Sequence, residues 1–107
     1  MTEIETNVNS GQLDTFIDHL WLEDGLSKNT LESYRADLSQ FNTWLVNINS
    51  HLLEANQADI QHYLAVKFPQ SKPRSISRLI ASMRRFYRYA LRDIVEYRLD
   101  SPQASGF

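Results

Sequence analysis

One segment, from Arg74 to Arg92, divides into an apolar side and a basic side when it is wound as an α-helix at about 100° per residue. The apolar side consists of Ile76, Leu79, Ile80, Met83, Phe86, Tyr87, Ala90 and Leu91. The basic side consists of Arg74, Arg78, Arg84, Arg85, Arg88 and Arg92, and the segment contains no acid. The apolar side therefore needs a hydrophobic core, and the basic side is expected to face an anion.

Charge is distributed unevenly along the chain. Residues 1–66 contain ten acids and two bases, which gives a net charge of −8. Residues 67–98 contain nine Lys or Arg and two acids, a net charge of +7, and Asp100 completes the formal −2 of the whole chain. The small net charge of the whole chain conceals a strongly basic segment over 67–98, and this asymmetry favours an anionic partner.

The length of 107 residues suits one domain that can fold around its own core. The absence of Cys excludes disulfides, iron–sulfur clusters and thiolate zinc sites, and it fits a reducing compartment. The first twelve residues are polar, unlike a secretory signal peptide, and no apolar run approaches the ~20 residues of a membrane span. We therefore expect a cytoplasmic protein that is not associated with a membrane.

Four stretches have the apolar spacing of amphipathic helices, and none has the alternation of a strand. They run from about Gly11 to Asp24, from the N-cap Ser27 to about Asn47, from the N-cap Asn56 to Phe68-Pro69, and from Lys72-Pro73 to about Arg92. The apolar side of the first stretch consists of Leu13, Phe16, Ile17, Leu20 and Trp21. Ser and Asn are favoured N-caps, and Gly25 is well placed to end the first helix. The prediction is an all-α bundle over 11–100, preceded by a flexible segment over 1–10 and followed by the start of a linker over 101–107.

Two blocks of the sequence resemble a known family. The run Gly25-Leu26-Ser27-Lys28-Asn29-Thr30-Leu31, followed by Tyr34-Arg35-Ala36-Asp37-Leu38, resembles the amino-terminal signature of Xer-type tyrosine recombinases, which belong to the phage integrase family. Residues 78–89 are similar to the last long helix of the same domain. The resemblance implies a compact bundle of four to five helices, similar to a SAM domain, that binds one face of a recombination half-site.

The resemblance also implies partners and a division of labour. The partners would be double-stranded DNA and, through the full-length protein, related recombinase subunits, whereas this domain alone would be monomeric. In the family a separate carboxy-terminal domain carries the catalytic residues, among them a His-x-x-Arg box and a nucleophilic Tyr. None of His19, His51 and His62 is followed three residues later by Arg. We therefore expect binding without cleavage, and not an enzyme.

The residues predict neither a metal site nor a cofactor. The three His lack the spacing of a metal-binding helix, and no Gly-rich phosphate loop or nucleophile elbow occurs. Asp14 and Asp18 lie four residues apart on one helix, where a solvated pair is a better interpretation than an acid–base dyad.

The candidate DNA-binding residues lie at the fourth helix and around the second. Arginines along a helix can follow the closely spaced phosphates of a duplex, and a helix start offers free backbone N–H groups to a phosphate oxygen. The fourth helix and the residue before it contribute Lys72, Arg74, Ser75, Arg78, Arg84, Arg85 and Arg88, and the second contributes Ser27, Lys28, Asn29, Thr30 and Arg35.

Each assignment has an alternative. The basic side could be solvated or could pair with the acidic half of the same chain, and Ser27 could serve only as a cap. Four aromatic residues on the apolar stripes are assigned to the core rather than to base stacking, and Tyr89 is left open; the four are Tyr34, Trp44, Phe86 and Tyr87.

Two other functions compete with DNA binding. One is a helical interaction module whose basic helix docks an acidic protein. The other is a basic amphipathic helix on a membrane or held by a calmodulin-like partner, which is disfavoured because the apolar side has the width expected in a bundle.

Overall fold

The computed structural model describes residues 2–95, with side chains over 11–92, and every regular element in this part is helical. The elements are α1 (Thr2–His19), η1 (Leu20–Asp24), α2 (Lys28–Val46), α3 (Gln57–Lys67), η2 (Phe68–Gln70), α4 (Pro73–Tyr89) and η3 (Ala90–Val95). The predicted all-α bundle is therefore confirmed. The linker predicted over 101–107 lies outside the described residues.

Local side chains set the starts and stops of the helices as predicted. The Oγ of Ser27 accepts a hydrogen bond from the backbone N–H of Thr30 at 3.2 Å, which caps α2. Asn56 and Asp59 form a reciprocal capping box at the start of α3. Gly25 adopts the left-handed conformation, with φ of 62°, where a side chain would be strained.

The ends of two helices differ from the prediction. In place of the expected start at Gly11, α1 begins at Thr2, because nothing in residues 2–10 removes a helical hydrogen bond. At their other ends α1 and α4 do not stop but continue as the π-helices η1 and η3. The fourth helical stretch thus passes Arg92 and reaches Val95.

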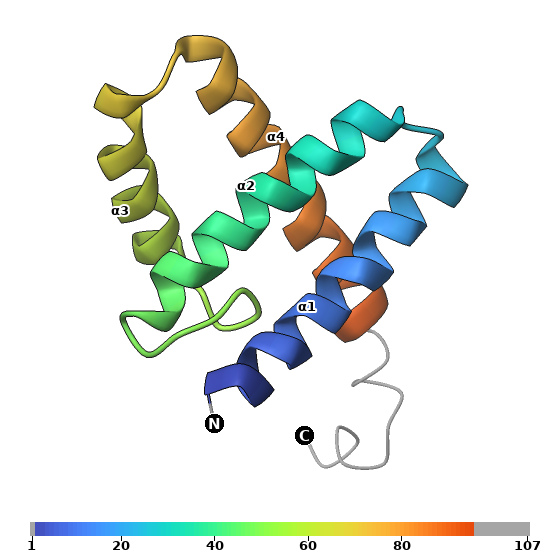
Figure 1. Ribbon diagram of the computed structural model, residues 1–107, viewed down its shortest axis with the longest axis horizontal. Coiled ribbons are helices and arrows are strands. Elements are labelled where there is room, and N and C mark those ends of the chain that lie inside the picture. Colours follow the sequence, from blue (N-terminus) through green and yellow to red (C-terminus); the bar gives the residue numbers. More distant parts are fainter. Residues whose placement is uncertain (1, 96–107) are drawn as a thin grey trace.

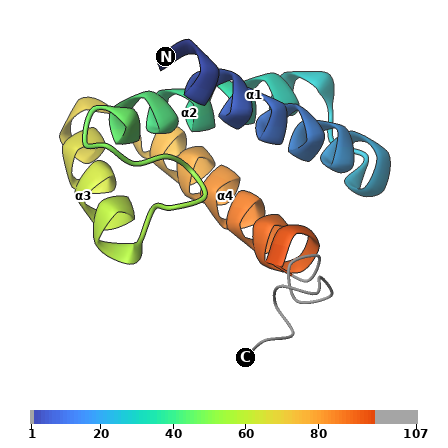
Figure 2. The ribbon, with the colours of Figure 1, turned by 90° about the horizontal axis from the view of Figure 1, so that it is seen from below.

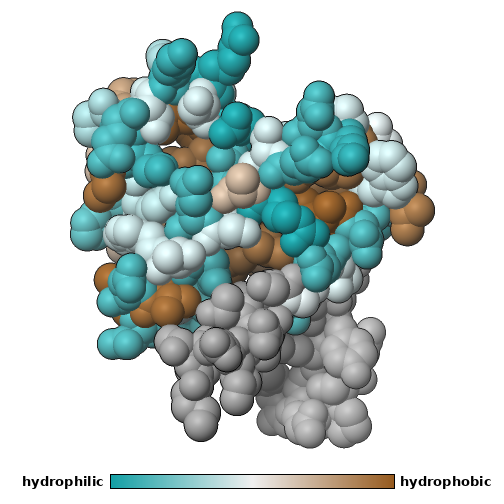
Figure 3. All heavy atoms as spheres, viewed as in Figure 1, coloured by the Kyte–Doolittle hydropathy of each residue, from teal (hydrophilic) through white to brown (hydrophobic). Residues whose placement is uncertain are grey.

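Figures 1 and 2 show how the helices are layered. In Figure 1, α1 and α2 lie side by side, α4 crosses behind them, and α3 stands on the far side of α2 from α1. Seen from below in Figure 2, α4 lies on the opposite side of the domain from α1. The face that α1 and α2 present in Figure 3 is mostly hydrophilic, with apolar residues visible in patches. The outward side of α4 is therefore a separate surface.

The core is built from the apolar stripes of all four α-helices. An edge-to-face contact between Phe16 of α1 and Phe86 of α4, with ring centroids 5.3 Å apart, joins two helices distant in sequence. The buried cluster comprises Leu13, Phe16, Leu20, Leu31, Tyr34, Leu38, Phe41, Leu45, Leu52, Tyr63, Leu79, Met83 and Phe86. These apolar side chains recur at helical spacing and are buried between the helices, so packing between helices stabilises the bundle.

Two residues assigned to the apolar stripes are exposed, so that part of the prediction is wrong. Trp21 is 56% exposed and Leu91 is 66% exposed. Both lie at the edge of their stripe, since at 100° per residue each falls roughly 100° from the centre of the buried residues of its own stretch. Leu20 and Ala90, near the centres of the stripes in the same π-helical segments, are buried as predicted.

The loop between α2 and α3 is anchored through one buried residue, Leu52. Its backbone N–H donates to Oδ1 of Asn42 at 3.2 Å. Its carbonyl accepts a hydrogen bond of 2.7 Å from the hydroxyl of Tyr87 in α4. The loop is thus tied to both α2 and α4. Burial of the Tyr87 hydroxyl raises its pKa, and the nearby charge of Asp59 adds to this effect.

Candidate nucleic-acid interface

The outward side of α4 carries exposed arginines. Arg74, Arg84 and Arg88 are exposed, and Arg92 continues the same side into η3. None of these four has an ion-pair partner among the residues that the structure describes. A row of unpaired guanidinium groups on one helix provides a positive potential and free donors for an anion.

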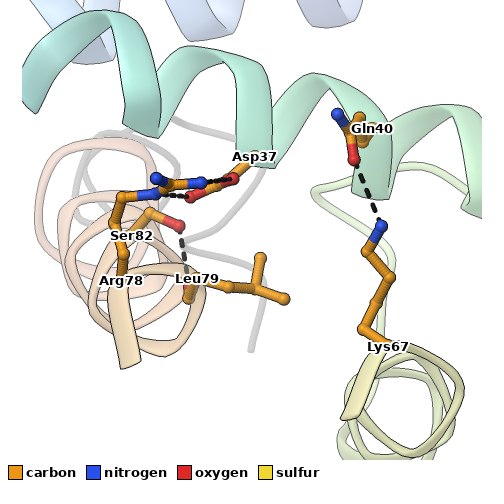
Figure 4. Close-up of polar contacts among 6 residues, drawn as sticks. All are labelled: Asp37, Gln40, Lys67, Arg78, Leu79 and Ser82. Atoms are coloured by element: carbon orange, nitrogen blue, oxygen red, sulfur yellow. Dashed lines mark hydrogen bonds and ion pairs between the residues drawn. The ribbon is translucent and has the colours of Figure 1, made fainter. Parts of the chain in front are cut away.

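Arg78 differs from these residues because it is already paired. Its Nε and one Nη donate to the two carboxylate oxygens of Asp37 in α2, at 2.8 and 2.9 Å (Figure 4). Asp37 is only 9% exposed, and the hydrogen bond to it raises the pKa of Arg78. The predicted alternative, an intramolecular acidic partner, holds for this residue. A contact between Arg78 and DNA stays a prediction.

Arg85 is paired as well, but near the surface. One of its Nη atoms donates to Oδ2 of Asp24 at 2.8 Å, and the two side chains are 38% and 40% exposed. This pair ties Asp24, the last residue of η1, to α4. The turn at Gly25, which leads into the predicted site at the start of α2, is thereby anchored to α4.

A polar cavity of about 220 Å³ opens beside this ion pair. Its lining comes from the end of α1, from η1, from the last turns of α4 and from η3, and it comprises His19, Leu20, Asp24, Arg85, Arg88, Tyr89 and Arg92. Tyr89, which the sequence left open, packs its ring against Phe16 and His19 at centroid distances of 5.4 and 5.2 Å. Tyr89 therefore belongs to the wall of a cavity that contains three arginines.

At the start of α2, two of the predicted residues bond to each other. The hydroxyl of Ser27 donates to Oγ1 of Thr30 at 2.9 Å and also caps the helix, so both hydroxyls already have a partner. Lys28 and Asn29 are exposed beside them. The first backbone N–H groups of a helix have no partner within it, which leaves this end able to accept an anion.

The remaining predicted residues lie elsewhere. Arg35 forms an ion pair with Asp14 and so joins α2 to α1, away from the basic side of α4. Lys72 is the residue before α4 and makes no capping bond through its side chain, while Arg74 and Ser75 lie in the first turn of α4. The structure therefore pairs Arg35 with α1 rather than with the arginines of α4.

The aromatic residues follow the sequence assignment. Tyr34 and Phe86 are buried, at 8% and 0% exposure, and are confirmed as core. Trp44 and Tyr87 are half-buried and pack against that core.

Sequence reasoning missed the acids that organise this surface. Asp37 stands on the edge of the apolar stripe of α2, between Tyr34 and Leu38, and a buried acid needs a cation or hydrogen-bond donors as partners. That signal was available for Asp37. Nothing comparable marked Asp24, which follows Glu23 directly before Gly25.

The requirements of a metal site and of a membrane-spanning helix are not met among the described residues. No group of three or more His, Cys, Asp or Glu side chains is arranged to hold a metal within the part of the chain that the structure describes. No helix among the described residues is long and apolar enough to cross a membrane.

Comparison with known proteins gives the same family as the sequence blocks. The tyrosine recombinase XerD of Pseudomonas putida is 46% identical over 82 residues, 76% of this chain and 28% of that protein. XerD of Shewanella oneidensis is 45% identical over 80 residues, with 74% and 27% covered. XerD of Yersinia pestis is 42% identical over 93 residues, with 86% and 30% covered.

The chain spans less than a third of the length of these curated relatives. No solved structure matches it. Residues 13–93 match the family described as phage integrase, N-terminal SAM-like domain. This match covers most of the chain and coincides with the helical bundle that the structure describes, and the chain therefore belongs to the phage integrase N-terminal SAM-like domain family.

Proposed function

We propose that this chain binds duplex DNA through the outward side of α4 and the adjacent start of α2, as the DNA-binding part of a site-specific tyrosine recombinase. The observation that carries the proposal is the row of exposed arginines, Arg74, Arg84, Arg88 and Arg92, without acidic partners among the described residues. Surface helices usually pair such charges with Glu or Asp. Four guanidinium groups that lack an acidic partner in this part of the chain are suited to a polyanion.

The dimensions of the surface fit a duplex. At about 1.5 Å per residue, Arg74 and Arg92 lie roughly 27 Å apart along the helix axis. A duplex carries about one phosphate charge per 1.7 Å of its axis, so several phosphates lie within reach of such a row. Neutralising them releases condensed counterions, which supplies affinity without base-specific contacts.

The ion pairs divide the arginines by role. Arg74, Arg84 and Arg88 are available without breaking any described contact, whereas Arg78 would have to leave the buried carboxylate of Asp37. We therefore assign the main phosphate contacts to these three residues, which all lie in α4, while Arg92 extends the row into η3. Arg78 chiefly holds α4 against α2 and so sets the direction in which the others point.

Catalysis is assigned to another part of such a recombinase. The chain contains no His-x-x-Arg box, and the XerD relatives are more than three times as long as the segment that matches. The proposed partners are a recombination half-site and related recombinase subunits. This domain would bind the DNA and orient it, without cleaving it.

Duplex binding by a triple variant tests the proposal. Replacement of Arg74, Arg84 and Arg88 by Gln should abolish binding at low salt and leave the helical circular dichroism spectrum unchanged, because these side chains lie outside the core. The variant K67Q is the matched control, since Lys67 at the end of α3 bonds to Gln40 (Figure 4) and lies off the α4 surface. Wild-type affinity in the folded triple variant would exclude this surface.

The interaction-module alternative predicts a different result from the same proteins. Wild-type protein that fails to bind duplex at low salt, but binds an acidic polypeptide through the same three arginines, would replace DNA with a protein partner.

A further inference from the structure

The carboxylate of Asp24 lies in the polar cavity among three arginines. It accepts a hydrogen bond from Arg85 at 2.8 Å, while Arg88 and Arg92 line the same cavity and have no acidic partner among the described residues. One carboxylate is therefore surrounded by more positive charge than it can neutralise. Such an arrangement is typical of an anion site that is only partly filled.

We infer that Asp24 holds the place of a phosphate: a backbone phosphate of bound DNA enters this cavity, takes Arg85 from Asp24 and contacts Arg88 and Arg92 as well. This inference rests on the proposed function, because it names the ligand group at one end of the same surface. It also assigns Asp24 an inhibitory role that no sequence pattern indicated.

The chemistry of the two anions supports the exchange. Planar guanidinium groups bind carboxylate and phosphate oxygens with the same paired geometry, so Arg85 can pass from one to the other. Both members of the existing pair are more than a third exposed, and an ion pair in that position is weak. A phosphate gains further donors from Arg88 and Arg92, whereas Asp24 is held on a short side chain beside Arg85.

The cavity has the size and the walls for this role. Its volume of about 220 Å³ leaves room for a group larger than one water, whose share of the liquid is roughly 30 Å³. Buried Leu20 and the ring of Tyr89 are part of its lining, and the packing of Tyr89 on Phe16 ties that part of the lining to the core. The arginines are therefore positioned by packed elements.

Two substitutions that each remove one negative charge test the inference. D24N frees Arg85, whereas D18N removes an exposed acid of α1 that has no ion pair within the described residues. We expect D24N to tighten duplex binding about two- to fivefold more than D18N, the range that follows from releasing a weak ion pair. Equal effects of the two substitutions on duplex affinity would show that Asp24 acts only through its contribution to net charge. That result would overturn the proposed exchange of Arg85 between Asp24 and a phosphate.

A double-mutant cycle shows whether the gain passes through Arg85. In an R85Q background, D24N should tighten binding no more than D18N does, because no guanidinium is left to release. A full gain in that background would overturn the assignment of Arg85.

A second readout separates this inference from the proposed function. The guanidinium ¹⁵N resonances of Arg85, assigned by their loss in R85Q, should shift with duplex and, at higher concentration, with inorganic phosphate, and D24N should need less of either. If no duplex binds, the proposed function is wrong, and a shift with phosphate alone would limit the cavity to free phosphate. No shift with either ligand in D24N would overturn the anion site itself.

Discussion

The guanidinium of Arg78 in α4 donates two hydrogen bonds, at 2.8 and 2.9 Å, to the carboxylate of Asp37 in α2. The two residues are 41 positions apart in the sequence, so the pair fixes a tertiary contact. Nearby, the hydroxyl of the buried Ser82 donates a hydrogen bond to the backbone carbonyl of Leu79 (Figure 4). The Arg78–Asp37 pair thus joins α2 to α4 and constrains how the basic side of α4 is turned.

Removing the carboxylate charge of Asp37 should destabilise the fold. D37N leaves Arg78 without its ionic partner, and we expect the free energy of unfolding to fall by about 1–3 kcal/mol in urea titrations. Exposure of the Arg78 side chain keeps the loss below that of a fully buried pair. D18N, at an exposed acid, should change stability by less than about 0.5 kcal/mol. Wild-type stability in D37N would show that desolvation of the pair offsets its attraction.

Truncation of two aromatic residues should change the free energy of unfolding by very different amounts. F86A removes a fully buried ring that contacts Phe16, and it should cost about 3–5 kcal/mol. W21A removes a ring that is 56% exposed, so the free energy of unfolding should change by less than about 0.5 kcal/mol. Chemical denaturation followed by circular dichroism measures both. A large loss in W21A would restore the core position that the sequence predicted.

Much of the fold follows from short-range features of the sequence. Ser27, Asn56 and Gly25 define helix ends through bonds and backbone angles within a few residues, so their roles can be predicted locally. The apolar stripes predict burial at their centres, including Leu20 and Ala90 in the π-helical segments. They fail for Trp21 and Leu91 at their edges, because the width of the buried arc depends on which neighbouring helix covers it.

The pairing of charges could not be predicted in the same way. Helical periodicity places Arg78 and Arg85 on the basic side with the other arginines, but it cannot identify Asp37 or Asp24 as partners from distant segments. That choice depends on how α2 and η1 pack against α4. The sequence therefore predicts a basic surface, and the structure is needed to separate its unpaired arginines from its paired ones.

Stability should fall at alkaline pH through Tyr87. Burial raises the pKa of this phenol above its ordinary value of 10.0. Above about pH 10 the unfolded chain loses the proton while the native state keeps it, so stability is lost as pH rises, by up to ~1.4 kcal/mol per pH unit. Y87F should be less stable at neutral pH, because the hydrogen bond to Leu52 is absent, but its decline above pH 10 should be shallower.

Urea titrations at pH 7 to 11 measure this difference. Tyr63, whose pKa is also raised by burial and by the nearby charge of Asp37, should leave part of the alkaline decline in Y87F. Identical declines in the two proteins would contradict the assignment to Tyr87.

The salt dependence of duplex binding should rank three single variants by the availability of their charge. Binding should weaken with salt at a logarithmic slope of about −0.9 per phosphate neutralised. R88Q removes an unpaired, exposed guanidinium and should flatten the slope by roughly one unit, while K67Q should leave it unchanged. R78Q should flatten it less than R88Q, because Asp37 already holds Arg78 in the free protein. Fluorescence anisotropy over roughly 50 to 200 mM salt resolves such differences. If R78Q flattened the slope as much as R88Q, the Asp37 pair would have to open when DNA binds, and Arg78 would join the phosphate contacts.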